Sequence, residues 1–367
     1  MRRDYAENVG IDPNRLREAS RLIRRAISKK AFPGAVFLVA RRGAIVAYEA
    51  HGEAVSVPPE ISRPMKLDTV FDLGSITKPV ATATSLMILL ERGKVRLNDP
   101  VSRYLPEYVE ERKDEITLYN LLTHTSGLPA WRPLYKKCKS RWDFLKELCR
   151  MKLEYPPGSK VVYSCLGFIL LTFIIERIAG ESLASFSRNE IFKPLGMKDT
   201  LFNPPREMRD RIAATEKCSW RRRILIGEVH DENAFGMGGV SGNAGLFSTA
   251  IDLAIFAQTF LNMGEYGQNR ILSPLTVKLM TRNHTPELNE PRGLGWALKS
   301  NGSSAGDLLS PFTFGHTGFP GCSLWIDPEE DLIVILLTNR VHPTRENDAI
   351  LRIRPLFHNI IASSIID

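Results

Sequence analysis

Uninterrupted apolar runs near both ends of the chain predict buried strands. Residues 34–40 (GAVFLVA) and 44–48 (AIVAY) flank a short polar stretch, which indicates a hairpin with Gly43 in its turn. Similar runs near the C-terminus, at residues 312–318, 322–326 and 332–338, indicate further strands. We therefore expect one mixed sheet that both ends of the chain complete.

Helical patterns fill the chain between these runs. Residues 13–30 place Leu16, Ile23 and Ile27 on one stripe and arginines on the other face. Residues 51–70, with three prolines, indicate a loop. Further helices are expected at residues 80–93, 141–151, 166–179, 182–197 and 345–365, and residues 116–128 indicate a short helix that ends in a polar turn. This order predicts a sheet domain of residues 1–95 and 296–367 and an inserted, mainly helical domain of residues 96–295.

Ser75 and Lys78 lie three residues apart where a loop turns into a helix. Gly74 suits a tight entry turn, and Pro79, which has no N–H, fits the first helical turn, so Ser75 falls near the N-cap. Residues i and i+3 share a helix face, so the Lys78 ammonium can lie beside the Ser75 hydroxyl. A nucleophilic serine needs a base and donors for an oxyanion, which a buried lysine and a helix N-terminus supply. Because Ser-x-x-Lys also fits an ordinary helix start, other segments of the chain must decide whether Ser75 is a nucleophile.

Charge and cysteine content narrow the possible partners. The net charge of +8 among 367 residues is a mild excess that we expect to be spread along the chain, as a solvated face and without a nucleic-acid partner. Five cysteines without CxxC spacing indicate neither a disulfide framework nor a zinc site. The N-terminus lacks an apolar signal segment, and no apolar run is long enough to cross a membrane. We therefore expect a cytoplasmic chain, or a periplasmic or extracellular one if a leader was removed.

Two further stretches are interpreted as structural or as substrate-contacting. His124 and Ser126 are two positions apart and cannot face each other on a helix, so we interpret them as a turn. Residues 236–245 lack the Gly-Lys-Ser/Thr of a phosphate loop and indicate close backbone approach to a ligand or to another segment.

The polar pair His230 and Asp231 precedes that glycine-rich stretch. No second histidine lies at ligand spacing, so we expect no metal there and instead a hydrogen-bond cluster that orders a loop. No cofactor is expected elsewhere in the chain.

Three motifs, taken in order, resemble those of the serine β-lactamase and penicillin-binding protein superfamily. They are Ser75-Ile-Thr-Lys78 at a helix start, Tyr163-Ser-Cys165 before a buried helix, and His316-Thr317-Gly318 on a strand. The segments LLTHTSGLP, PPGSKVVYS, IFKPLGM and GLFSTAIDLAIF are also similar to the class C β-lactamase-like branch. That branch contains DD-peptidases, D-aminopeptidases and family VIII carboxylesterases. The resemblance covers about residues 15–345.

The resemblance implies an α+β fold of three layers, α/β/α, with an antiparallel sheet flanked by helices and an all-helical domain beside it. It also implies acyl transfer in the cleft between them. Ser75 attacks a carbonyl carbon while Lys78 and Tyr163 share its proton, and which of the two is the base stays open. The backbone N–H groups of Ser75 and Phe319 would form the oxyanion hole.

On the strand side, the resemblance places His316, Thr317 and Gly318 along the substrate, with Cys165 across the cleft. Two of these positions depart from the usual pattern. β-Lactamases usually carry Lys-Thr-Gly, whose permanent cation suits a substrate carboxylate, whereas histidine is about half-charged only near pH 6.5. Cys165 stands where asparagine is common, and a thiol donates and accepts poorly; we interpret it as a buried small residue rather than a reactive thiol.

These departures favour esterase and peptidase members of the branch. We expect a serine hydrolase acting on a small-molecule ester, a D-alanyl or other peptide, or weakly on a β-lactam. The alternatives are a true class C β-lactamase and a non-catalytic penicillin-recognising sensor or scaffold. Such sensors usually carry a membrane segment, and a scaffold has no need of Ser75, Lys78 and Tyr163 together.

Overall fold

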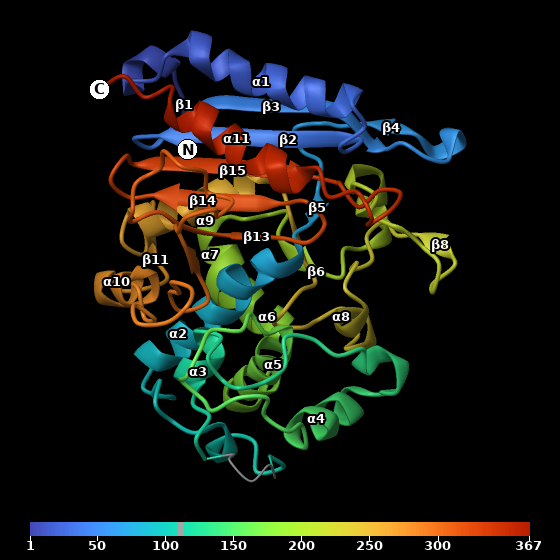
Figure 1. Cartoon of the computed structure of the whole chain (residues 1–367), viewed down its shortest axis with the longest axis vertical. Helices are drawn as coiled ribbons and strands as arrows, with labels where there is room; N and C mark the ends of the chain where they lie inside the picture. The colour runs from blue at the N-terminus through green and yellow to red at the C-terminus, as the bar shows by residue number, and fades with distance from the viewer. Residues whose placement is uncertain (109–113) are drawn as a thin grey trace.

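One large sheet forms the centre of the fold, with helices on both of its faces (Figure 1). The computed structural model describes residues 1–108 and 114–367. The strand order is β1-β3-β2-β15-β14-β13-β12, with β4 paired to β3, and all neighbours are antiparallel except β1 along β3. The strands are β1 (Arg2–Arg3), β2 (Gly34–Arg41), β3 (Ala44–Val55), β4 (Arg63–Pro64), β12 (Ala297–Leu298), β13 (Phe314–Thr317), β14 (Ser323–Asp327) and β15 (Leu332–Thr338).

The pairing of β15 with β2 joins the two ends of the chain, as the hydrophobic pattern predicts. Both strands are buried along their whole length because each face of the sheet carries its own core. Val36 and Leu38 belong to the core shared with the helical region, whereas Phe37 and Val39 belong to the core on the opposite face. Alternation between two cores explains why these strands appear in the sequence as continuous apolar runs.

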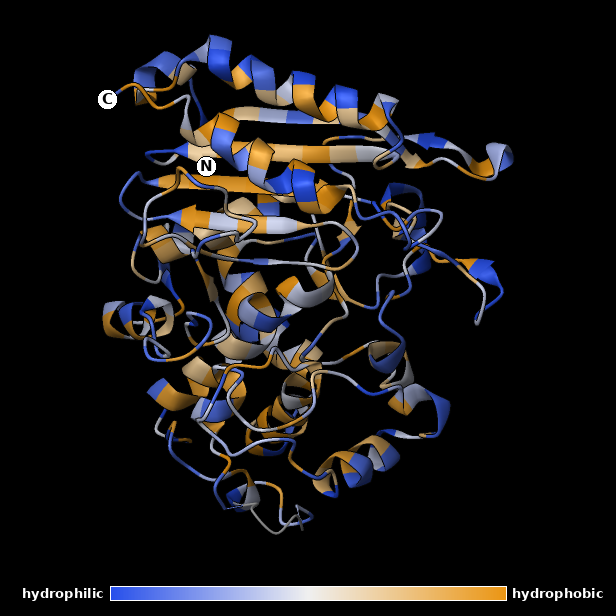
Figure 2. Cartoon of the chain, in the orientation of Figure 1, coloured by the Kyte–Doolittle hydropathy of each residue, from blue (hydrophilic) through white to orange (hydrophobic). Residues whose placement is uncertain are grey.

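Helices α1 (Pro13–Ser28) and α11 (Ile350–Ala362) lie side by side on the outer face of the sheet. Figure 2 shows hydrophilic and hydrophobic residues alternating along α1, and its residues Leu16, Ala19 and Ile23 are buried. Helix α9 (Ala250–Leu261) packs on the inner face against β15 and β2. Within the described residues, none of the helices combines the length and the apolar character required to span a bilayer.

The helical region lies beyond α9, and its core is continuous with the inner face of the sheet. Helix α5 runs through its centre; Ser164 caps its start by accepting from Gly167 N–H, and Gly180 ends it with a left-handed conformation. The larger helices here are α2 (Thr84–Glu91), α3 (Leu118–Leu122), α4 (Arg141–Cys149), α5 (Cys165–Ala179) and α6 (Leu183–Ser187). The division into domains of residues 1–95 with 296–367 and of residues 96–295 stays a prediction.

Two local expectations were wrong. The stretch 51–70 is not all loop, because β3 continues to Val55 and pairs with β4. The helix after Ser75 is not α-helical from its start: a 3-10 turn (Gly74–Ile76) precedes wide π-helical turns (Lys78–Ala83), and α2 begins only at Thr84. Pro79 has no N–H to donate, which removes one α-helical hydrogen bond from this segment.

Candidate active site

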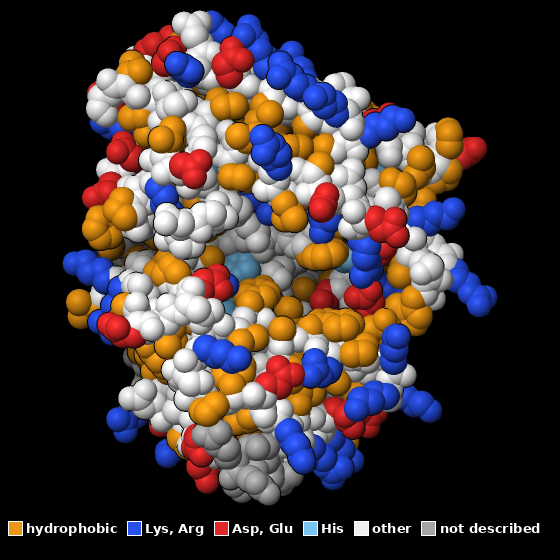
Figure 3. All heavy atoms as spheres, viewed as in Figure 1, with side chains coloured by type: hydrophobic (Ala, Val, Ile, Leu, Met, Phe, Trp, Pro, Cys, Tyr) orange, Lys and Arg blue, Asp and Glu red, His pale blue; other side chains and the backbone are white. Residues whose placement is uncertain are grey.

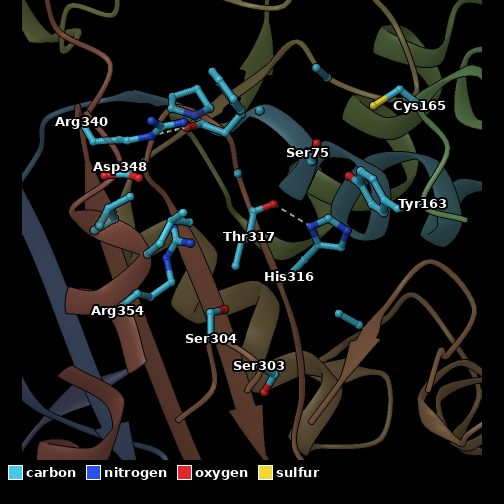
Figure 4. Close-up of a pocket in the computed structure, with 18 of the residues that line it drawn as sticks. Ser75, Tyr163, Cys165, Ser303, Ser304, His316, Thr317, Arg340, Asp348 and Arg354 are labelled. Atoms are coloured by element: carbon cyan, nitrogen blue, oxygen red, sulfur yellow. Dashed lines mark hydrogen bonds between the residues drawn. The ribbon is translucent and has the colours of Figure 1, made fainter. Parts of the chain in front are cut away.

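A cleft of about 1140 Å³ lies between the sheet and the helical region. Figure 3 shows it as a hollow near the middle of the molecule, with histidine at its floor. In Figure 4, Ser75, Tyr163 and Cys165 lie on one side of the cleft, and His316 and Thr317 lie across from them on β13. The three sequence motifs are spread over about 240 residues of the chain, and the structure brings them together at a single cavity.

A small three-stranded sheet holds the segment that carries Ser75. Strand β5 (Phe71–Asp72) pairs with β9 (Leu246–Ser248), and β9 also pairs with β6 (Leu201–Phe202). This pairing fixes the chain just before Ser75 beside the chain just after the glycine-rich stretch.

Lys78 lies fully buried directly behind Ser75. Its Nζ is 3.0 Å from Ser75 Oγ, 3.0 Å from the backbone oxygen of Asn243 and 3.6 Å from Cys165 Sγ. The same Nζ lies 4.7 Å from the centre of the Tyr163 ring. The amine is thus held by three acceptors, one of which is the predicted nucleophile.

The ionisation of Lys78 depends on its two acidic neighbours. Burial lowers the pKa of Lys78, whereas negative charge on Cys165, Tyr163 and Asp231 raises it, and the net direction is upward. Burial also raises the pKa of the Tyr163 phenol and of the Cys165 thiol, so both are neutral near pH 7. Neutral Cys165 and Tyr163 withdraw two of the influences that raise the Lys78 pKa, and burial favours the neutral amine, which is the form that accepts a proton from serine.

Tyr163 is oriented by His124, which the sequence indicated only as part of a turn. His124 is buried, has a φ of +59°, and accepts the Ser164 N–H at Nδ1 over 3.0 Å. Its ring lies 4.6 Å from the Tyr163 ring. The Tyr163 hydroxyl is buried and has no hydrogen-bond partner among the described residues. His124 therefore fixes the loop that delivers this free hydroxyl to the cleft.

His316 is neutral in this site. Its Nδ1–H donates to the Thr317 carbonyl oxygen over 2.7 Å, and burial lowers the pKa of the imidazole well below 6.5. In the neutral ring Nε2 then carries a lone pair, and the described residues offer it no partner. His316 presents a substrate with an acceptor, not with a cation.

Gly74 opens the position predicted for the oxyanion. Its φ is +50°, and a Cβ there would lie 3.1 Å from Phe319 N and 2.6 Å from Pro320 Cδ. A side chain would therefore push the Phe319 N–H away from Ser75. The Phe319 N–H donates to no backbone acceptor among the described residues, so this N–H is available to a ligand.

A buried carboxylate holds the turn in front of Ser75. Asp72 accepts Gly74 N–H at 2.9 Å and His230 N–H at 2.6 Å, and burial raises the pKa of its carboxyl. The His230 ring contacts Glu216 over 3.2 Å and stacks on the Phe319 ring with centroids 5.5 Å apart. The hydrogen-bond cluster predicted at His230 is present, and it supports both predicted oxyanion donors.

The glycine-rich stretch approaches two helical segments closely, as predicted. Gly242 N–H donates to Thr172 Oγ1 on α5 over 2.7 Å, and Gly242 O accepts from Thr82 Oγ1 over 2.9 Å. A Cβ on Gly242 would lie 2.3 Å from Phe168 O. This contact places the Asn243 carbonyl against Lys78.

Sequence reasoning missed Asp72, His124, Asn243 and Arg292. Arg292 lines the cleft, is nearly buried, pairs with Glu290 at 2.6 Å and has an unpartnered Nε among the described residues. Its guanidinium lies 5.4 Å from the Tyr163 ring centre. Asp72 is close to Ser75 in the chain but belongs to no motif, and tertiary folding brings the other three residues near Ser75.

Comparisons with known proteins agree with this geometry. The family model described as Beta-lactamase matches residues 19–356. A candidate D-alanyl-D-alanine carboxypeptidase of Salmonella enteritidis is 36% identical, covering 92% of this chain and 85% of that protein. An N-acetylmuramyl-L-alanine amidase of Bacillus subtilis is also 36% identical, covering 92% of this chain and 83% of the relative.

Solved structures show the same fold at lower identity. EstCE1, a hydrolase with promiscuous acyltransferase activity, superposes with a TM-score of 0.75 at 24% identity, over 95% of this chain and 99% of its own. The octameric penicillin-binding protein homologue from Pyrococcus abyssi has a TM-score of 0.74 at 22% identity, over 93% of this chain and 76% of its own. The chain belongs to the Beta-lactamase family, within the β-lactamase and penicillin-binding protein superfamily that its motifs resemble.

Proposed function

We propose that this protein is a serine hydrolase that forms an acyl-enzyme on Ser75 and acts on small esters or on amides of the D-alanyl peptide type. The observation that carries the proposal is the 3.0 Å contact between Lys78 Nζ and Ser75 Oγ at the floor of the cleft. A neutral lysine in this position accepts the serine proton as Oγ attacks the carbonyl carbon.

The remaining groups have complementary roles in the proposal. The N–H groups of Ser75 and Phe319 stabilise the oxyanion, and Gly74 keeps the space between them open. The Tyr163 hydroxyl, which has no partner in the described part of the chain, donates to the leaving group. Water then releases the acyl group from Ser75.

An extended substrate fits the strand side of the cleft. Strand β12 pairs with β13 only at Phe314 and Gly315, so no described strand covers the same edge at His316 and Thr317. A peptide-like substrate can lie along that edge as an added strand. The neutral His316 disfavours recognition of a β-lactam carboxylate, so we expect weak or absent β-lactam hydrolysis.

Arg292 favours a peptidase within this proposal. Its Nε has no partner among the described residues, as is also the case for Arg354 of the same cleft, and its ion pair with Glu290 leaves this donor free. A terminal carboxylate of a D-alanyl peptide complements such a group. The curated relatives named above act, by their names, on D-alanyl-D-alanine and on an N-acetylmuramyl-L-alanine linkage.

The test is hydrolysis of p-nitrophenyl butyrate, a peptide ending in D-Ala-D-Ala, and nitrocefin by the wild type and Ser75→Ala. We expect Ser75-dependent turnover of the ester or the peptide that exceeds turnover of nitrocefin. Fast nitrocefin hydrolysis would instead identify a class C β-lactamase. Absence of Ser75-dependent turnover with all three would favour the sensor or scaffold alternative.

A further inference from the structure

The N-terminal helix carries a local excess of positive charge. Residues 13–30 hold seven lysines and arginines and a single acidic residue, a net charge of +6, and shorter basic runs occur at residues 132–141 and 221–223. This concentration corrects the even spread expected from the sequence. The seven side chains, all exposed, are here called the basic face: Arg15, Arg17, Arg21, Arg24, Arg25, Lys29 and Lys30.

The basic face covers the outward side of α1. Leu16 and Ile23 are buried against the sheet. Arg21 and Arg25 lie on the opposite side of the helix, and Arg17 and Arg24 lie on its flank, about 100° around the helix from the buried stripe. Sixteen helical residues extend the row over about 24 Å. Figure 3 shows this row of basic side chains along the upper edge of the molecule.

The charge of the basic face is nearly unneutralised. Among the described residues, only Arg21 of the seven has an ion-pair partner, the neighbouring Glu18. An exposed pair of this kind is weak, so the face presents a strong positive potential to solvent.

Exposed leucines accompany the basic face. Helix α11, which packs beside α1, exposes 65% of Leu351 and 40% of Leu356. Leu308, 60% exposed, follows a loop that is tied to α11 by a 2.6 Å hydrogen bond from Asp307 N–H to Asn359 Oδ1. Large apolar side chains thus lie in the same outer helical layer as the arginines.

We propose that α1 and α11 form a docking surface for a lipid bilayer with anionic headgroups. The arginines contact lipid phosphates, and Leu351, Leu356 and Leu308 enter the interfacial zone. A nucleic acid would satisfy the arginines but gains nothing from three exposed leucines, so the combination favours lipid. Because Leu351 also lines the cleft, docking holds the rim of the cleft next to the bilayer. This inference does not depend on the proposed function.

Co-sedimentation of the full chain with vesicles tests the proposal. We expect binding to vesicles of phosphatidylglycerol and phosphatidylcholine, not to pure phosphatidylcholine, and loss of binding at high salt. The triple variant Arg17→Glu, Arg24→Glu, Arg25→Glu is expected to weaken binding at least about tenfold. A matched control, Lys139→Glu, Lys193→Glu, Lys198→Glu, changes the net charge equally at exposed lysines of the helical region and is expected to bind almost as the wild type does.

A leucine variant distinguishes binding to a bilayer from binding to any polyanion. Leu351→Ser combined with Leu356→Ser is expected to weaken vesicle binding while leaving salt-dependent binding to dextran sulfate unchanged. Equal vesicle binding by the leucine variant and the wild type would overturn the lipid assignment. Failure of the wild type to bind anionic vesicles, or equal loss in the α1 variant and the lysine control, would overturn the docking surface itself.

Discussion

A buried lysine is costly to a fold unless acceptors surround its amine, because burial removes the water that would solvate the charge. Lys78 has such acceptors in Ser75 Oγ and Asn243 O, and no carboxylate of the described residues forms a hydrogen bond with its amine. A carboxylate would hold the lysine protonated at all working pH values. Its replacement by neutral acceptors leaves Lys78 able to exchange a proton with Ser75.

Replacement of this lysine by an apolar side chain of similar length tests its role. Lys78→Met is expected to lower kcat/KM for an ester substrate by about 10²–10⁴-fold, because the proton acceptor of Ser75 is removed. The thermal unfolding midpoint is expected to be unchanged or higher, since methionine does not need acceptors in a buried site. Activity within threefold of the wild type, measured on folded variant, would rule Lys78 out as the proton acceptor.

At this scale the sequence identified the residues proposed to react, but not the residues that hold them in place. Ser75, Lys78 and Tyr163 were predicted because a short spacing or a motif order identifies them. Asp72 and His124 were not, because their contacts depend on a left-handed backbone at Gly74 and at His124 that no local pattern announces.

The glycine-rich stretch is the element that sets the distance between α5 and the Ser75 segment. Gly242 contacts Thr172 and Thr82 through its backbone, and the next residue, Asn243, holds Lys78. Composition predicted a close approach but not its partner, because the partner helices are separated from it by about 70 and 160 residues.

Gly242→Ala is expected to disrupt this approach. Its Cβ would lie 2.3 Å from Phe168 O, so the backbone must shift, at a cost of about 1–3 kcal/mol of stability. Because the shift moves Asn243 O away from Lys78, kcat is also expected to fall. Chemical denaturation and ester hydrolysis measure the two effects.

The matched control is Gly167→Ala on α5, where the new Cβ would lie 3.3 Å from the side chain of Leu121 and 4.0 Å from Leu121 O and from Ser164 Oγ. Alanine is the better helix former, so this variant is expected to keep wild-type stability or to gain slightly. Equal behaviour of the two alanine variants would contradict the role assigned to the Gly242 contact.

Each face of the large sheet has its own core, a third and smaller core surrounds Val70 and Phe247, and buried histidines lie on both faces of the sheet. His124 and His316 lie on the cleft side, and His358 lies on the buried side of α11, where burial lowers its pKa to about 3. A histidine that is neutral when folded binds fewer protons than when unfolded. The contribution of such a histidine to the free energy of unfolding therefore falls as the pH drops from 6.5 toward its pKa in the folded protein. Asp252 has the opposite effect on stability: burial raises its pKa to about 6, so its contribution falls as the pH rises toward 6.

His358→Gln separates one of these contributions. The glutamine amide can still donate to Ser304 O, which accepts from His358 Nδ1 at 2.7 Å, but it does not titrate. Between pH 6.5 and about 4 the variant is expected to lose less stability than the wild type, by up to about 1.4 kcal/mol per pH unit. Urea unfolding at several pH values measures the slopes, and parallel slopes would contradict a neutral His358 in the folded protein.

The outer layers were predicted well at this scale. The strands at both ends and the closing helix follow from apolar runs that each match a length and a period. The sequence pattern did not predict that α9 would pack on the sheet. Helix α9 is apolar on most sides, so the spacing of its apolar residues does not indicate which element it packs against.

The central claim is that Ser75 is the nucleophile of an acyl-enzyme, and intact-mass spectrometry tests it most directly. The wild type and Ser75→Ala are each exposed to a fluorescent penicillin and, separately, quenched during turnover of p-nitrophenyl butyrate. The account predicts a mass increase equal to one acyl group in the wild type with at least one reagent, mapped to the peptide that contains Ser75 and absent from Ser75→Ala. An adduct of equal yield in Ser75→Ala, or turnover that survives this substitution, would contradict it.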